Sequence, residues 1–173
     1  HFIEDERIQI PSFPFLGVIL SGGHTQLVDV RDHFNMNILG TTLDDAIGEA
    51  FDKCGKRMGL PYPSGPQIDK LAEKGNPHKF IFPISKLSNY NVSYSGVKTA
   101  FINFISNSEQ KNPDFIKNNL VDLCASLQYT LVQIILNKIE LVARDKNLTE
   151  IVIGGGVAAN TEIRKQLQDI VIK

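Results

Sequence analysis

Three segments of the sequence hold residue types that can bind a phosphorylated or hydroxyl-rich ligand. The first is Ser21-Gly22-Gly23, which lies between two short apolar runs. Two glycines leave backbone N–H groups uncovered and the serine adds a hydroxyl, a combination that can hold a phosphate group. The same residues also suit an ordinary hairpin turn. This segment alone leaves both interpretations open.

The second segment runs from Gly154 to Asn160 and reads Gly-Gly-Gly-Val-Ala-Ala-Asn. We expect it to follow a strand and to open a helix, where free N–H groups and the helix dipole attract anions. Its spacing matches neither the G-x-G-x-x-G fingerprint nor a P-loop, which disfavours a dinucleotide-binding fold. The glycines could lie against an adenine or a ribose, and Asn160 could hydrogen-bond to it. A plain strand–helix turn is the alternative.

The third segment is rich in acidic side chains, which are Asp44, Asp45, Glu49, Asp52 and, after Ser64-Gly65, Asp69. Residues 45, 49 and 52 are spaced so that one helix face would carry three carboxylates. Because like charges repel on a helix, such a face needs a hydroxyl-rich or cationic partner. Ribose hydroxyls would suit as this partner, because they can donate hydrogen bonds to the carboxylates. A solvated helix face is the alternative.

Metal-binding and nucleophilic patterns are weak in this chain. The four histidines, His1, His24, His33 and His78, form no H-x-x-x-H pair, and the two cysteines form no C-x-x-C pair. The motif around Ser95 and Lys98 places a serine and a lysine at helical spacing, but without a G-x-S-x-G elbow. The residues therefore identify no metal ligand and no catalytic side chain.

The elements that must position these segments alternate between strand and helix. Apolar runs at 16–20 and 26–30 predict a β-hairpin, residues 37–40 a third antiparallel strand, and residues 150–153 a later strand. Overlapping capping boxes at Thr41 and Thr42 predict a helix over 43–58 that stops at Gly59. We also expect helices over 67–74, 94–105 and 157–168, a polar loop over 107–113 and a terminal strand over 170–172.

The longest predicted helix spans 113–144 and carries an apolar stripe at the 3–4 spacing of a core-facing helix. Its members are Leu120, Leu123, Cys124, Leu127, Leu131, Ile134, Ile135 and Ile139. The resulting organisation is a β-meander over 13–40, a mostly helical insert with the long helix over 41–145, and a strand–turn–helix unit over 150–173.

Composition narrows the class of protein further. The 173 residues are 42% apolar and carry a formal net charge of −1, which suits one packed domain and excludes a chain-wide basic field. No apolar run reaches the roughly 18–20 residues of a membrane-spanning helix. Cys54 and Cys124 are too few for a disulfide framework and suit buried thiols in a reducing compartment. With no signal peptide at the N-terminus, we expect a cytoplasmic location.

Five motifs in order resemble those of the TsaD family of tRNA N6-adenosine threonylcarbamoyltransferases, formerly called the glycoprotease family. The motifs are Ser-Gly-Gly-His-Thr-Gln-Leu at 21–27, the Leu-Asp-Asp-Ala to Gly-Glu-Ala-Phe-Asp-Lys stretch at 43–53, Tyr-Pro-Ser-Gly-Pro at 62–66, Ser-Tyr-Ser-Gly-Val-Lys-Thr at 93–99 and Gly-Gly-Val-Ala-Ala-Asn at 155–160. His24 after the two glycines resembles the bacterial and organellar branch of the family. Ser64 departs from the family, which usually has glycine there.

The resemblance implies an α/β, actin/hexokinase-like (ASKHA) fold with a ribonuclease-H-like core and inserted helices, of which this chain is a part. It further implies that threonylcarbamoyl-AMP lies in the cleft. Ile19, Leu20, Ser21, Gly22 and Gly23 would line its acyl-phosphate side. The ribose would meet Asp52, Gly65 and Asp69, and Asn160 would meet the adenosine end.

The implied reaction moves the threonylcarbamoyl group to N6 of the adenosine beside the anticodon of tRNAs that read ANN codons. The resemblance also implies one divalent metal, iron or zinc, whose ligands this chain lacks, and TsaB-like and TsaE-like partner subunits, with no membrane or DNA partner. His1 is not assigned as a ligand. Two alternatives remain, a non-catalytic nucleotide-binding fragment or partner subunit and a metalloendopeptidase. These 173 residues alone are expected to be inactive.

Overall fold

The structure, a computed structural model, describes residues 11–171 and contains one four-stranded sheet in the order β3-β2-β1-β4. Strands β1 (Phe15–Leu20), β2 (Thr25–Val30) and β3 (Met36–Thr41) form an antiparallel meander, as the short apolar runs predict. Strand β4 (Ile151–Gly154) pairs with β1 in parallel. This pairing brings the end of β4 beside the end of β1, although more than 130 residues separate them in the chain.

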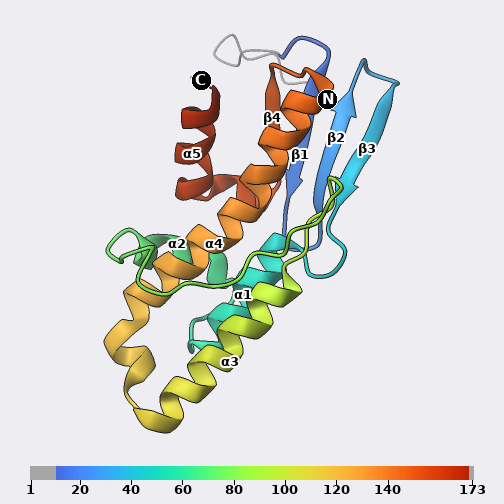
Figure 1. The fold of residues 1–173 in the computed structure, drawn as a ribbon. Coiled ribbons are helices and arrows are strands. Elements are labelled where there is room, and N and C mark those ends of the chain that lie inside the picture. Colours follow the sequence, from blue (N-terminus) through green and yellow to red (C-terminus); the bar gives the residue numbers. More distant parts are fainter. Residues whose placement is uncertain (1–10, 172–173) are drawn as a thin grey trace.

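Five α-helices and one 3₁₀ helix complete the described part of the chain (Figure 1). They are α1 (Ile47–Arg57), α2 (Ser64–Ala72), α3 (Ser95–Lys111), α4 (Phe115–Lys146), η1 (Gly156–Ala159) and α5 (Thr161–Val171). In Figure 1, α1, α2 and α3 lie below the sheet, and α4 runs from their far end up past the sheet. The helical layer and the sheet therefore meet at the lower ends of β1 and β4.

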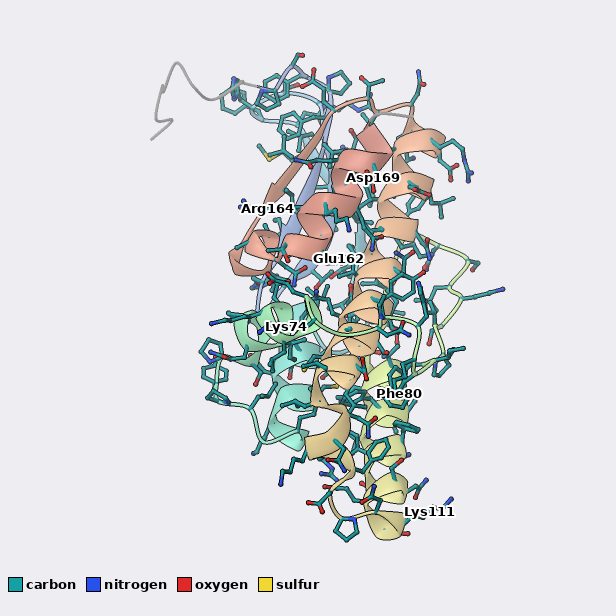
Figure 2. The ribbon with its side chains drawn as sticks, turned by 90° about the vertical axis from the view of Figure 1, so that its left-hand side faces the viewer. Lys74, Phe80, Lys111, Glu162, Arg164 and Asp169 are labelled. Carbon is teal, nitrogen blue, oxygen red and sulfur yellow. The ribbon has the colours of Figure 1, made fainter. Side chains whose placement is uncertain are left out.

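The long helix α4 forms the centre of the core. Its predicted stripe is buried from Leu123 to Ile139, and only Leu120 remains partly exposed. One cluster of buried side chains joins this stripe to the inward residues of β1 and to α1, α2, α3 and α5. Near the start of α4, Phe80 (labelled in Figure 2) packs against Phe104 and Phe115, with ring centroids 5.2 and 5.9 Å apart.

Among the helices of residues 11–171, only α4 is long and apolar enough to cross a membrane by length and composition. Two thirds of its most apolar window, 67%, is buried within this fold. A core helix of this length shows the same composition, because it must pack against neighbours on most of its circumference.

The predicted start of the first helix is wrong. α1 begins at Ile47 rather than at residue 43, and its N-cap residue Ala46 makes no side-chain cap. The expected capping residues have other partners. The Thr42 hydroxyl donates to the carbonyl of Asp45, and the Asp44 carboxylate accepts hydrogen bonds from residues 93–95. The predicted stop at Gly59 is confirmed, and that residue has a φ of +78°.

Other boundaries also differ from the prediction. α2 begins at Ser64, because Pro66 falls in the first turn, where no intrahelical N–H is needed. The predicted polar loop over 107–113 is wrong over most of its length, since α3 continues to Lys111. η1 separates the glycine turn from α5. The terminal strand is wrong as far as it is described, because α5 extends to Val171.

Candidate functional site

A cavity of about 350 Å³ opens where the ends of the sheet meet the helices. Its walls come from the β1–β2 turn, from α1, from the α1–α2 connection with the start of α2, and from the η1 region. The residues that line it are Gly22, Gly48, Phe51, Asp52, Tyr62, Pro63, Gly65, Pro66, Asp69, Gly156, Val157, Ala159 and Asn160. This volume lies at the lower end of the range for small-molecule sites.

Five of the nine predicted site residues line this one cavity: Gly22, Asp52, Gly65, Asp69 and Asn160. The other four belong to the strand and turn that lead to it. Leu20 is fully buried in the core, whereas Ile19 points away from the core and is 39% exposed. The two glycine-bearing turns thus share a cavity, as the sequence predicted for them.

The β1–β2 turn is organised by its own serine. The Ser21 hydroxyl oxygen accepts hydrogen bonds from the backbone N–H groups of Gly23, at 3.3 Å, and His24, at 2.9 Å. Both N–H groups are therefore occupied, which corrects the expectation that they face the cleft uncovered. The Gly22 N–H has no hydrogen-bond acceptor among residues 11–171. Within this turn, Gly22 is the residue that the cavity reaches.

The first turn of α1 packs directly against this glycine turn. The Gly48 N–H donates to the Ser21 carbonyl at 3.2 Å. A Cβ atom at Gly48 would lie 2.8 Å from both the Gly22 Cα and the Ser21 carbonyl oxygen, closer than real Cβ contacts. Gly48 is therefore required for this close approach. Sequence reasoning missed it as a wall residue, although it precedes Asp52 by one helical turn.

The two predicted ribose carboxylates differ in how the protein holds them. Asp52 Oδ1 accepts the Ser64 N–H at 2.7 Å, and its Oδ2 accepts no hydrogen bond within residues 11–171. Both carboxylate oxygens of Asp69 accept hydrogen bonds from Thr161. One accepts the Thr161 N–H at 3.0 Å and the other accepts the Thr161 hydroxyl at 2.7 Å. Asp69 thereby ties α2 to the N-terminus of α5. In Figure 2, Glu162 in the first turn of α5 lies above Lys74, which follows α2 in the chain.

The predicted three-carboxylate face does not exist as a ligand site. Asp45 precedes α1 and forms ion pairs with Lys53 and Lys98, both at 2.6 Å, and Glu49 pairs with Lys53 at 2.8 Å. Burial alone would raise the pKa of Asp45, but the hydrogen bonds and charges of Lys53 and Lys98 outweigh it and lower that pKa. The cationic partner is thus supplied by the chain itself. Only Asp52 of the three lines the cavity.

Asn160 is buried and already has two structural partners. Its Oδ1 accepts the Ile163 N–H at 3.0 Å, which caps α5, and its Nδ2 donates to Gln128 Oε1 at 2.8 Å. Its side chain therefore holds α5 against α4 at the cavity wall. A ligand that contacts Asn160 would meet a residue whose orientation is fixed.

Ser64, which stands where the family usually has glycine, does not line the cavity. Its hydroxyl donates to the Pro61 carbonyl at 3.0 Å, and its side chain is packed against Gly55 of α1. A Cβ atom at Gly55 would lie 2.2 Å from the Ser64 Cβ. The serine therefore contacts α1, and its hydroxyl neither crowds nor bonds a cavity ligand.

The described residues offer no metal centre and no activated nucleophile. Among residues 11–171, no three His, Cys, Asp or Glu side chains are grouped so that they could hold a metal ion, and His1 lies outside that range. Burial raises the pKa of the Cys54 and Cys124 thiols to about 12. Ser95 donates to Asp44 and Lys98 pairs with Asp45, which excludes the serine–lysine nucleophile. The site can bind and orient a ligand.

Solved structures show that the fold is actin/hexokinase-like. Full-length HypF, in a phosphate- and nucleotide-bound form, superposes with a TM-score of 0.67 over 94% of this chain and 35% of its own, at 10% identity. The activator of the 2-hydroxyisocaproyl-CoA dehydratase from Clostridium difficile, with bound ADPNP, superposes with a TM-score of 0.53 over 95% of this chain and 53% of its own, at 14% identity.

Sequence comparisons identify a much nearer set of proteins. The family model described as "TsaD: tRNA N6-adenosine threonylcarbamoyltransferase" matches residues 2–172. Proteins of that name are 48% identical over 169 residues in Christiangramia forsetii and 40% identical over 172 residues in Bacillus subtilis. These matches cover 98% and 97% of this chain but 50% and 48% of the relatives, so the chain spans about half their length. The chain belongs to the TsaD family of tRNA N6-adenosine threonylcarbamoyltransferases.

Proposed function

We propose that the complete protein transfers the threonylcarbamoyl group from threonylcarbamoyl-AMP to N6 of the adenosine beside the anticodon of tRNAs that read ANN codons. In this reaction N6 forms a bond to the carbamoyl carbon and loses a proton. The bond from that carbon to the phosphate oxygen breaks, and AMP leaves. Membership of the family over nearly the whole chain supports the assignment.

One observation carries the proposal. Gly22, Asp52, Gly65, Asp69 and Asn160, drawn from segments up to 138 residues apart, line a single cavity of about 350 Å³. These residue types are suited to hold a nucleoside monophosphate: glycines allow a close backbone approach, and a carboxylate accepts hydrogen bonds from ribose hydroxyls.

The proposed role of these residues is binding and orientation. Asp52 Oδ2 accepts a ribose hydroxyl, while the Ser64 N–H holds the other oxygen. The Gly22 N–H is the donor that the turn leaves for the phosphate end. Asp69 and Asn160, fixed by Thr161, Ile163 and Gln128, keep the α5 wall at a set distance. Fixed groups of this kind lower the entropic cost of placing the acyl carbon for attack.

The proposal includes one divalent metal, iron or zinc, for the complete protein. Residues 11–171 do not fit such a group, because they bring no three donor side chains together. We therefore assign no step of the reaction to a metal at this cavity. TsaB-like and TsaE-like partner subunits and a cytoplasmic location also belong to the proposal.

A tRNA-modification assay tests the proposal directly. The complete protein, supplied with threonylcarbamoyl-AMP, tRNA and its partner subunits, should form N6-threonylcarbamoyladenosine. Residues 1–173 alone should give no product. A casein-cleavage assay runs in parallel, and cleavage without tRNA modification would favour the metalloendopeptidase instead. Nucleotide binding without either activity would favour a non-catalytic binding role.

A further inference from the structure

Tyr62 presents a large aromatic ring at the mouth of the cavity. Tyr62 is 85% exposed although it lines the cavity wall. Other strongly exposed apolar side chains, such as Phe34 at 99% and Ile81 at 91%, are not part of that wall. Exposing such a ring forfeits the stability that its burial would give, so its place beside a cavity indicates a ligand that covers it.

The backbone on both sides of this ring is held in place. Prolines 61 and 63 flank Tyr62 and restrict the backbone φ angle at both positions. Before them, the Leu60 N–H donates to the Gly55 carbonyl at 2.9 Å. After them, the Ser64 N–H donates to Asp52 and the Ser64 hydroxyl donates to the Pro61 carbonyl. A ligand that meets this ring therefore loses little affinity to the ordering of a flexible loop.

The composition of the wall indicates which part of a ligand lies here. No Lys, Arg or His lines the cavity, and its two charged side chains are the carboxylates of Asp52 and Asp69. Such a wall disfavours a second or third phosphate and suits an uncharged group. Phe51, Pro63 and Pro66 add apolar surface beside the tyrosine. A flat, uncharged, aromatic group beside a ribose has the chemistry of a nucleobase.

We propose that the Tyr62 ring stacks on the purine of the nucleotide held in this cavity. The inference rests on the proposed function, because that function supplies the nucleotide. Stacking needs the flat ring and not its hydroxyl. Its contribution to nucleotide affinity should match that measured for other base–aromatic pairs. Tyr62 is thus a binding residue for the nucleotide.

Calorimetric titration of the complete protein with AMP tests the proposal. Tyr62→Ala should weaken AMP binding about tenfold, Tyr62→Leu should weaken it less, and Tyr62→Phe should bind within about twofold of wild type. Because the ring is exposed, the thermal unfolding midpoint should not move. Phe34→Ala removes an equally exposed ring outside the cavity and should bind AMP as wild type does.

Two outcomes would overturn the inference. Wild-type AMP affinity in Tyr62→Ala would leave the proposed function standing but remove the stacking role. Equal loss in Tyr62→Phe and Tyr62→Ala would assign the effect to the hydroxyl. In the first case, a raised KM of Tyr62→Ala for tRNA would assign the ring to the RNA. Absence of AMP binding in the wild type would instead contradict the proposed function itself.

Discussion

Asp52 and Asp69 line the same cavity, but their carboxylates are engaged differently. Asp69 binds Thr161 through both oxygens, so its first task is to join α2 to α5. Asp52 binds the Ser64 N–H through one oxygen only. A ligand hydroxyl can therefore be accepted by Asp52 without breaking a contact of the fold, and Asp52 is the better residue for testing nucleotide recognition.

We predict that Asp52→Asn weakens AMP binding by about 1–3 kcal/mol, the usual contribution of a hydrogen bond to a charged group. The asparagine amide oxygen can still accept the Ser64 N–H, so the free energy of unfolding should change little. Calorimetry measures the first quantity and urea denaturation the second. Asp32→Asn, in the turn before β3, is the control with the same charge change. Equal AMP affinity in both variants would contradict the assignment.

The sequence predicted which residues lie at the cavity better than it predicted their hydrogen-bond and ion-pair partners. Gly22, Asp52 and Gly65 were expected at a ligand, and they line one cavity. The ion pair of Asp45 with Lys98 was not expected, because Lys98 lies 53 residues away and only the packing of α3 against α1 brings it near. Likewise, nothing local in the sequence shows that Gln128 binds Asn160.

At the scale of elements, α3 is capped by a residue of a different segment. Asp44 accepts hydrogen bonds from the Tyr94 and Ser95 N–H groups and from the Ser93 and Ser95 hydroxyls. Burial alone would raise the pKa of Asp44, but these four hydrogen bonds outweigh it and lower that pKa below its usual 3.8. The charged form of Asp44 therefore stabilises the start of α3.

Replacing this cap should lower stability in a pH-dependent way. We predict that Asp44→Ala destabilises the protein by about 1–2 kcal/mol at neutral pH, as loss of a helix cap does. Because the folded-state pKa is lowered, the contribution is fully present above pH 3.8 and is lost as pH falls through the folded value. Urea midpoints of variant and wild type should therefore converge in acid.

Asp114→Ala is the matched control for this prediction. Asp114 occupies the N-cap position of α4 but makes no side-chain cap. Its replacement should cost little at any pH. If Asp44→Ala were as mild as Asp114→Ala at neutral pH, the bonds to residues 93–95 would not stabilise α3.

The connection from β4 to η1 depends on one glycine. Gly155 has a φ of +97°, and a Cβ atom there would lie 2.3 Å from the Leu20 carbonyl oxygen. We predict that Gly155→Ala destabilises the protein by about 2 kcal/mol or more, because the backbone of β1 cannot move aside. Gly154→Ala should be mild, since no atom lies within 4 Å of its added Cβ. Thermal unfolding of both variants provides the comparison, and equal midpoints would be the contrary result.

Element types were more predictable than element boundaries. The strands follow from short apolar runs and the α4 stripe from 3–4 apolar spacing, both of which local sequence carries. The predicted start of α1 was wrong because Asp44, which resembles a capping residue, binds residues 93–95, and because the Thr42 hydroxyl donates to the Asp45 carbonyl instead of accepting a helix N–H. Competition of this kind between local and distant partners is not visible in one segment.

On the scale of the whole molecule, the cavity depends on the parallel pairing of β1 with β4. That pairing sets the β1–β2 turn beside η1, and α1 and α2 close the space between them. The described residues thus build a cavity of about 350 Å³ but no cluster of three metal-binding side chains. We predict that residues 1–173 alone show no tRNA-modifying turnover with supplied threonylcarbamoyl-AMP, whereas the complete protein with its partners does. Equal turnover by residues 1–173 alone and by the complete protein would contradict this prediction.

The most direct test of the central claim is residue-resolved AMP binding. Amide chemical shifts of the isotopically labelled complete protein would be followed during titration with AMP. The amide signals of Gly22, Gly65 and Gly156 should shift together with one common dissociation constant, because all three residues line the cavity. Gly59 and Gly75, which do not line it, should stay unchanged. Saturable AMP binding that leaves the three cavity glycines unmoved would contradict the account.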